Sequence, residues 1–92
     1  MNIDITARNI TPSSELKEMI YQKIDKLSQY DHNINSAKIV LLKESRAEKV
    51  EIIISSEGHT YITKCYSSKF EKTFSKAIDN IINQIKKNKP KH

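Results

Sequence analysis

The spacing of hydrophobic residues along this 92-residue chain predicts an α+β fold with the element order β-α-β-β-β-α. In four segments apolar and polar residues alternate, which is typical of strands with one buried face, and in two others apolar residues recur at helical spacing. This order favours a four-stranded mixed sheet with both helices packed on one face and the first two strands parallel. We expect the opposite face of the sheet to be wetter.

The first strand and the first helix are predicted from the opening third of the chain. Ile3, Ile5 and Ala7 alternate with polar residues, which indicates a half-buried strand. Thr11 is expected to cap the helix and Pro12 to occupy its first position, where a missing N–H costs nothing. The apolar stripe of this helix runs through about residue 29 and comprises Leu16, Met19, Ile20, Ile24 and Leu27.

Three more strands are predicted between the two helices. The segment 31–33 breaks the first helix, and alternation of apolar and polar residues returns over 37–43. A polar turn at 44–48 leads to a third strand over 50–54. The segment 60–66 then completes the sheet.

The last helix is predicted to begin near Ser68, because Ser68 and Glu71 have the spacing of a capping box. Pro90 is expected to stop it, since proline cannot continue a helix. Its apolar face comprises Phe70, Phe74, Ala77, Ile78, Ile81 and Ile85.

Composition indicates a single domain spanning residues 1–92, with a flexible basic end at 86–92. The chain is 37% hydrophobic and 29% charged, with one glycine and two prolines, as in ordinary globular proteins. The lone Cys65 excludes an intramolecular disulfide, which fits a reducing cytoplasm. Asp4 near the start and the lack of a long apolar run argue against export and membrane insertion, so we expect a cytoplasmic protein.

Positive charge is concentrated in the second half of the chain. The net charge is +5, and residues 1–46 contain seven Lys or Arg against six Asp or Glu, whereas residues 47–92 contain nine against five. The segment 86–92 has four lysines and no acid, more cations than the negative end of a helix dipole accounts for. Such an end indicates a polyanionic partner, either a nucleic acid or an anionic membrane.

Helical geometry separates lysines from acids on the first helix. Lys23 and Lys26 fall on one flank of its apolar stripe, and the outward back carries Glu15, Glu18, Gln22, Asp25 and Gln29. On the last helix the predicted outer ridge contains Lys69, Lys72, Lys76, Asn80, Asn83 and Lys87. This ridge suits the phosphates of a nucleic acid, although lysine-rich helix faces also serve as solubilising surface.

No residue pattern indicates catalysis, a metal or a cofactor. The three histidines lack the spacing of metal ligands, and a single glycine cannot form a phosphate-binding loop. Cys65 lies on the inward side of its predicted strand and is interpreted as a core residue. Among the aromatic residues only Tyr66 is expected to be exposed, which favours shape and phosphate recognition of folded RNA over stacking of single strands.

Three segments of the chain resemble the ribosome hibernation promoting factors, a family also described as sigma-54 modulation proteins or ribosome-associated inhibitors. They are residues 1–12 (MNIDITARNITP), residues 23–30 (KIDKLSQY) and residues 77–79 (AID), the last followed by the basic end. The resemblance spans nearly the whole chain. With neither a second, dimerisation domain nor an acidic tail, the chain resembles the short form of the family.

The resemblance implies a non-enzymatic protein, without a cofactor, that docks on the 30S ribosomal subunit. Such a protein binds 16S rRNA, occupies the channel for messenger and transfer RNA, and inhibits translation in stationary phase or stress. The resemblance also implies a fold similar to double-stranded-RNA-binding domains, a monomer off the ribosome, and a second small hibernation factor as a partner in ribosome dimers. The expected RNA-binding residues are Lys23, Lys26, Lys76, Lys86, Lys87, Lys89 and Lys91.

One element departs from the family pattern. Where the family has an acidic residue followed by Met and Tyr, this chain has Thr73, Phe74 and Ser75. Phe74 can fill the apolar role of the methionine, whereas Thr73 supplies no acid.

The alternative function is a protein-interaction module that modulates a transcription factor without binding RNA. An enzyme, the third class of function, would need a pocket of convergent polar groups.

Overall fold

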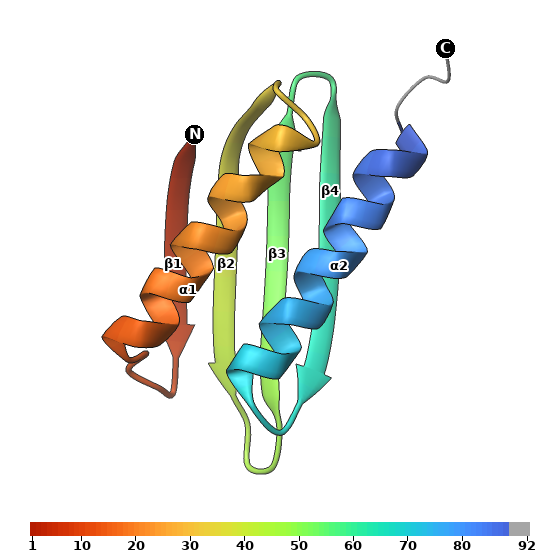
Figure 1. The fold of residues 1–92 in the computed structure, drawn as a ribbon. Coiled ribbons are helices and arrows are strands. Elements are labelled where there is room, and N and C mark those ends of the chain that lie inside the picture. Colours follow the sequence, from red (N-terminus) through yellow and green to blue (C-terminus); the bar gives the residue numbers. More distant parts are fainter. Residues whose placement is uncertain (89–92) are drawn as a thin grey trace.

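The computed structural model describes residues 1–88 and confirms the predicted α+β architecture (Figure 1). A four-stranded sheet has the strand order β1-β2-β3-β4, and both helices lie on one of its faces. The elements are β1 (Asn2–Arg8), α1 (Ser14–Asp25), the 3-10 helix η1 (Lys26–Gln29), β2 (Ile34–Lys43), β3 (Glu48–Ser56), β4 (His59–Ser67) and α2 (Phe70–Asn88).

The sheet is mixed, as the sequence predicts. β1 runs parallel to β2, with Asn2 opposite Ser36 at one end of the pairing and Arg8 opposite Leu42 at the other. Parallel neighbours need a long crossover connection, and α1 with η1 provides it. β2, β3 and β4 are joined as antiparallel neighbours by two short hairpins. The second hairpin turns at Gly58, whose φ of 75° lies in the left-handed region that favours glycine.

One hydrophobic core fills the space between the sheet and the two helices. The strands contribute every second residue to it, which confirms the alternation in the sequence. Ile3 and Ile5, on the edge strand β1, are only half-buried. The buried hydrophobic residues are Leu16, Ile20, Ile24, Leu27, Ala37, Ile39, Leu41, Val50, Ile52, Ile54, Tyr61, Cys65, Phe70, Phe74, Ala77, Ile78, Ile81 and Ile85.

The first helix starts two residues later than predicted. Ser13, not Thr11, is the N-cap: its backbone is extended, and its Oγ accepts a hydrogen bond from the N–H of Leu16 at 3.1 Å. Thr11 and Pro12 instead belong to the connection from β1. Several residues in this stretch have side chains suited to capping, so only the path of the backbone decides between them. The α-helix ends at Asp25, and η1 continues to Gln29 as a tighter last turn, close to the predicted end of the helix.

Replacing Ser13 with Ala should lower the free energy of unfolding by about 1 kcal/mol, because one N–H in the first turn of α1 loses its acceptor. Replacing Thr11 with Ala should change it far less. Urea denaturation of both variants, followed by circular dichroism, checks the assignment. If the two losses were equal, Ser13 would not be the cap.

The second helix also starts later than predicted. α2 begins at Phe70, so the expected capping box of Ser68 and Glu71 is wrong. The hydroxyl at this end is that of Ser67, which accepts a hydrogen bond from the N–H of Lys69 and contacts the hydroxyl of Thr73. The Thr73 hydroxyl is fully buried and donates to the carbonyl of Lys69 at 2.8 Å. Thr73, which stands where the family has an acid, is therefore part of the packing at the start of α2.

Three amide side chains, one turn apart along α2, fasten this helix to β4. Asn80 donates to the hydroxyl of Thr63 at 3.3 Å and to the sulfur of Cys65 at 3.4 Å. Gln84 donates to the carbonyl of Ile62 at 2.9 Å, and Asn88 donates to the hydroxyl of Tyr61 at 3.1 Å. We call Asn80, Gln84 and Asn88 the amide ladder. It lies on one flank of the apolar stripe, so α2 is held to the sheet by both apolar and polar contacts.

Candidate nucleic-acid interface

The structure brings five of the seven predicted RNA-binding lysines onto the helical layer of the molecule. Lys26, on η1, is exposed, as are the three predicted lysines on α2, Lys76, Lys86 and Lys87, whereas Lys23, on α1, is half-buried. We call these residues the helix-face lysines: Lys23, Lys26, Lys76, Lys86 and Lys87. Lys89 and Lys91 lie outside the described residues, as does Pro90. Residues 86–88 of the basic end form the last turn of α2, and the flexibility expected for this end stays a prediction.

Lys23 lies at the junction of the two helices. Its ammonium group donates a hydrogen bond to the hydroxyl of Ser75 on α2 at 3.2 Å. Ser75 immediately precedes Lys76, so this contact connects α1 to the part of α2 that carries the next helix-face lysine. The two helices are thus joined by a positively charged side chain rather than by apolar residues alone.

Lys86 connects the other end of α2 to the end of η1. Its ammonium group lies over the ring of Tyr30, 5.7 Å from the ring centroid, within the range of a cation–π interaction. Tyr30 directly follows η1, the element that carries Lys26. The sequence predicts these lysines as one RNA-binding set, and the contact with Tyr30 shows how the fold draws the two helical ends together.

All six residues of the predicted outer ridge of the last helix are exposed, although Lys69 lies just before the start of α2. Lys72, Lys76 and Lys87 are exposed, as is Asn83 between them. Asn80 is exposed as well, and its side chain also donates to β4 as part of the amide ladder. Helical periodicity places Asn80 on the exposed side correctly but does not reveal that Thr63 on β4 offers it a hydrogen-bond acceptor.

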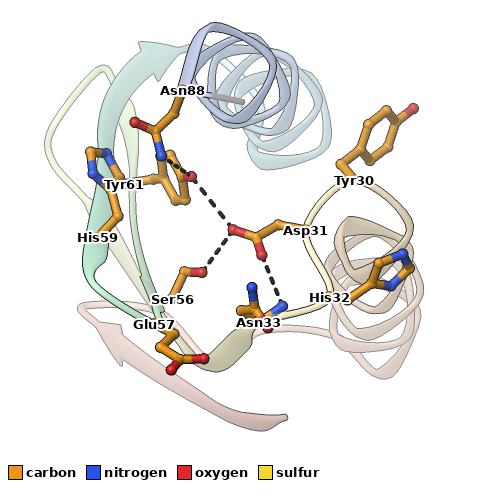
Figure 2. Close-up of a pocket in the computed structure, with 9 residues that line it drawn as sticks. All are labelled: Tyr30, Asp31, His32, Asn33, Ser56, Glu57, His59, Tyr61 and Asn88. Atoms are coloured by element: carbon orange, nitrogen blue, oxygen red, sulfur yellow. Dashed lines mark hydrogen bonds between the residues drawn. The ribbon is translucent and has the colours of Figure 1, made fainter. Parts of the chain in front are cut away.

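A pocket of about 270 Å³ lies where η1, the second hairpin and the end of α2 meet (Figure 2). Its centre is Asp31, whose carboxylate accepts hydrogen bonds from the Ser56 hydroxyl at 2.7 Å and the Asn33 N–H at 2.8 Å. The hydroxyl of Tyr61 donates to the same carboxylate over a longer 3.5 Å and accepts from Asn88. This network ties the end of α2 to the loop after η1.

Sequence reasoning missed this pocket. The segment 31–33 reads only as a helix break, and nothing in it points to Ser56 or Tyr61. His32 and His59 both line the pocket, although they are far apart in the sequence. Within residues 1–88, no group of three His, Cys, Asp or Glu side chains is placed to hold a metal ion. The hydrogen bonds of Asp31 instead give the pocket a structural role.

The helical layer is suited to an extended polyanion. α2 carries four lysines against two acids, Glu71 and Asp79, and the helix-face lysines form no ion pair within residues 1–88. Unpaired surface lysines release condensed counterions when they neutralise phosphates, which is the main source of affinity for nucleic acids. Neither of the two described α-helices combines the length and apolar character that crossing a bilayer requires.

Comparison with known proteins gives full-length matches. The ribosome hibernation promoting factors of Salmonella typhimurium and Escherichia coli K12 are each 28% identical to this chain over 92 residues, covering all of it and 93% of the relative. A ribosomal subunit interface protein from Coxiella burnetii superposes with a TM-score of 0.88 at 20% identity, covering 95% of this chain and 96% of its own. The N-terminal domain of Thermus thermophilus Protein Y gives 0.87 at 21% identity, covering 97% of this chain and all of its own.

These two solved structures share the fold described above. The decisive match is to a family model, because it spans nearly the whole sequence, from residue 3 to residue 92. It includes the opening strand, both helices and the basic end on which the resemblance rests. The chain therefore belongs to the family described as Sigma 54 modulation protein / S30EA ribosomal protein.

Proposed function

We propose that this protein is a ribosome hibernation factor that binds the 30S subunit through 16S rRNA, occupies the mRNA and tRNA channel and inhibits translation in stationary phase or stress. The observation that carries the proposal is the set of helix-face lysines, brought together on one layer in a chain that matches ribosome hibernation promoting factors along its whole length. The proposed RNA contacts are Lys23, Lys26, Lys76, Lys86 and Lys87, together with Lys89 and Lys91 beyond the described residues.

The proposed mechanism is binding without catalysis. Lysine ammonium groups neutralise phosphates of folded rRNA and position the protein, while the layer formed by α1 and α2 fills space that messenger and transfer RNA require. Residues 1–92 act as one ribosome-binding domain in the cytoplasm, monomeric off the ribosome. In ribosome dimers a second small hibernation factor is the proposed partner.

Co-sedimentation with purified ribosomal subunits tests this function. The protein should pellet with small subunits and not with large ones, because the proposed contacts are made to 16S rRNA. Prior loading of the small subunit with messenger RNA and initiator transfer RNA should reduce pelleting. Equal pelleting with loaded and empty subunits would contradict occupation of the channel.

Digestion of a cell lysate with ribonuclease separates this function from the modulation of a transcription factor. A protein bound to rRNA should leave the ribosomal fraction after digestion, since its ligand is destroyed. A protein held in a complex with another protein should stay in the same sedimentation fraction after digestion. Retention after complete digestion would favour the protein-interaction module.

A further inference from the structure

The open face of the sheet, opposite the helices, carries a row of residues that sequence reasoning did not connect. Arg8 on β1 is the register partner of Leu42 on β2, and Leu42 is the partner of Lys49 on β3. Lys49 is in turn opposite Tyr66 on β4. One line across all four strands therefore presents a cation, an apolar side chain, a second cation and an aromatic ring.

A shallow groove of about 180 Å³ contains three residues of this row, Arg8, Leu42 and Lys49, and carries excess positive charge. The only acid in its lining is Glu51, which is already paired with Lys64 at 3.4 Å. Within residues 1–88, no ion pair engages Arg8, Lys38 or Lys49. The groove is lined by Arg8, Lys38, Val40, Leu42, Lys49 and Glu51, so an apolar floor lies between unpaired cations.

The aromatic end of the row is open to solvent. The side chain of Tyr66 is 55% exposed, and Lys49 holds its ammonium group 5.5 Å from the ring centroid. Ile62, four residues earlier on the same face of β4, is 51% exposed. An exposed ring on a flat sheet, next to a cation, is the arrangement on which nucleic-acid bases stack.

We propose that this face is a second nucleic-acid contact that takes a short single-stranded RNA segment, with one base stacked on Tyr66 and phosphates bound by Arg8, Lys38 and Lys49. The groove combines cations with apolar surface, which matches the alternation of phosphate and base along a single strand. An acidic peptide would satisfy the cations but has no planar group to cover the ring. The contact lies on the opposite side of the sheet from the helix-face lysines, so both faces can be occupied at once.

The inference does not rest on binding to the small subunit. A protein that failed to pellet with small subunits but bound single-stranded RNA through this face would overturn the proposed function and leave the inference intact. A protein that pelleted with small subunits but did not bind single-stranded RNA through this face would overturn only the inference. The two experiments therefore fail independently.

Fluorescence anisotropy with a short labelled oligouridylate tests the stacking contact. Tyr66→Ala should weaken binding about tenfold, whereas Tyr66→Phe should bind as tightly as the parent protein because the ring remains. Unchanged affinity of the Tyr66→Ala variant would overturn the proposal. Thermal melting of both variants identifies any loss of affinity that comes from unfolding. If the hydroxyl of Tyr66 rather than its ring bound the RNA, Tyr66→Phe would bind as weakly as Tyr66→Ala.

The same assay tests the phosphate contacts with a matched control. The double variant Arg8→Gln, Lys38→Gln should lose about tenfold in affinity and show a shallower salt dependence, because two phosphate contacts are removed. The double variant Lys17→Gln, Lys69→Gln removes the same charge from exposed positions outside both proposed RNA contacts and should bind oligouridylate nearly as well as the parent. Equal losses in the two would overturn the proposal.

The choice of ligand is tested with a peptide of glutamates of similar length. The proposal requires oligouridylate to bind more tightly, and to perturb the amide NMR signals of Lys49 and Tyr66 more than that of Lys17, which belongs to neither proposed RNA contact. Tighter binding of the peptide would show that the face serves an acidic protein and would overturn the proposal.

Discussion

A variant with Lys23, Lys26, Lys86 and Lys87 all replaced by Gln should bind small ribosomal subunits about a hundredfold more weakly than the parent protein at physiological salt. Each lysine is assigned one phosphate contact, so the slope of log affinity against log salt should become shallower by roughly three. Glutamine keeps a hydrogen-bonding side chain at Lys23, where the parent contacts Ser75 at 3.2 Å. Sedimentation at several salt concentrations measures both quantities.

The matched control removes the same charge from other places on the surface. Lys17, Lys43, Lys64 and Lys69 are exposed and are not among the proposed rRNA contacts. Two of them form ion pairs, Lys43 with Glu48 and Lys64 with Glu51, but exposed pairs of this kind contribute little to stability. Replacing all four with Gln should weaken binding much less. If both variants lost equal affinity, net charge rather than a defined surface would account for binding.

Replacing Phe74 with Ala should lower the free energy of unfolding by about 3 to 5 kcal/mol. Phe74 is fully buried in the core beneath α2, and its removal leaves a cavity that the sheet and helices cannot close. Small domains typically have a free energy of unfolding of about 5 to 15 kcal/mol, so this single change removes a large part of the stability of the protein. Urea denaturation followed by circular dichroism measures the loss.

Ile62 provides the matched control for this prediction. It is also a large hydrophobic residue, but it lies on the open face of the sheet and is 51% exposed. Replacing Ile62 with Ala should change the free energy of unfolding by less than about 1 kcal/mol. A comparable loss at both positions would mean that the core is not concentrated between the sheet and the helices.

The sequence predicted the elements and their buried faces well because those depend on local periodicity. Alternation identified the inward side of β2, β3 and β4, and helical spacing identified the apolar stripes of α1 and α2. Both helices start later than predicted: the cap of α1 is Ser13 and not Thr11, and α2 begins only at Phe70. Ser13 competes with Thr11 as a cap, and Ser67 with Ser68, and neighbouring hydroxyls of this kind are separated only by the backbone path into the helix.

The candidate sites were predicted less completely because they depend on contacts between distant segments. Periodicity placed Lys23 and Lys86 on helices, but no local pattern reveals that one meets Ser75 and the other Tyr30. The row that ends at Tyr66 requires the register of all four strands, since a shift of one residue would turn it to the opposite face. Sequence reasoning anticipated the exposure of Tyr66 but not its neighbours.

The amide ladder has a consequence for the thermodynamics of binding. An apolar stripe alone lets a helix roll on a sheet, whereas Asn80, Gln84 and Asn88 fix the rotation of α2 about its own axis against β4. The directions in which Lys76, Lys86 and Lys87 leave the helix are thus set before any ligand arrives. Association then orders only flexible lysine side chains and not the backbone, which makes α2 a preorganised surface with a reduced entropic penalty for binding.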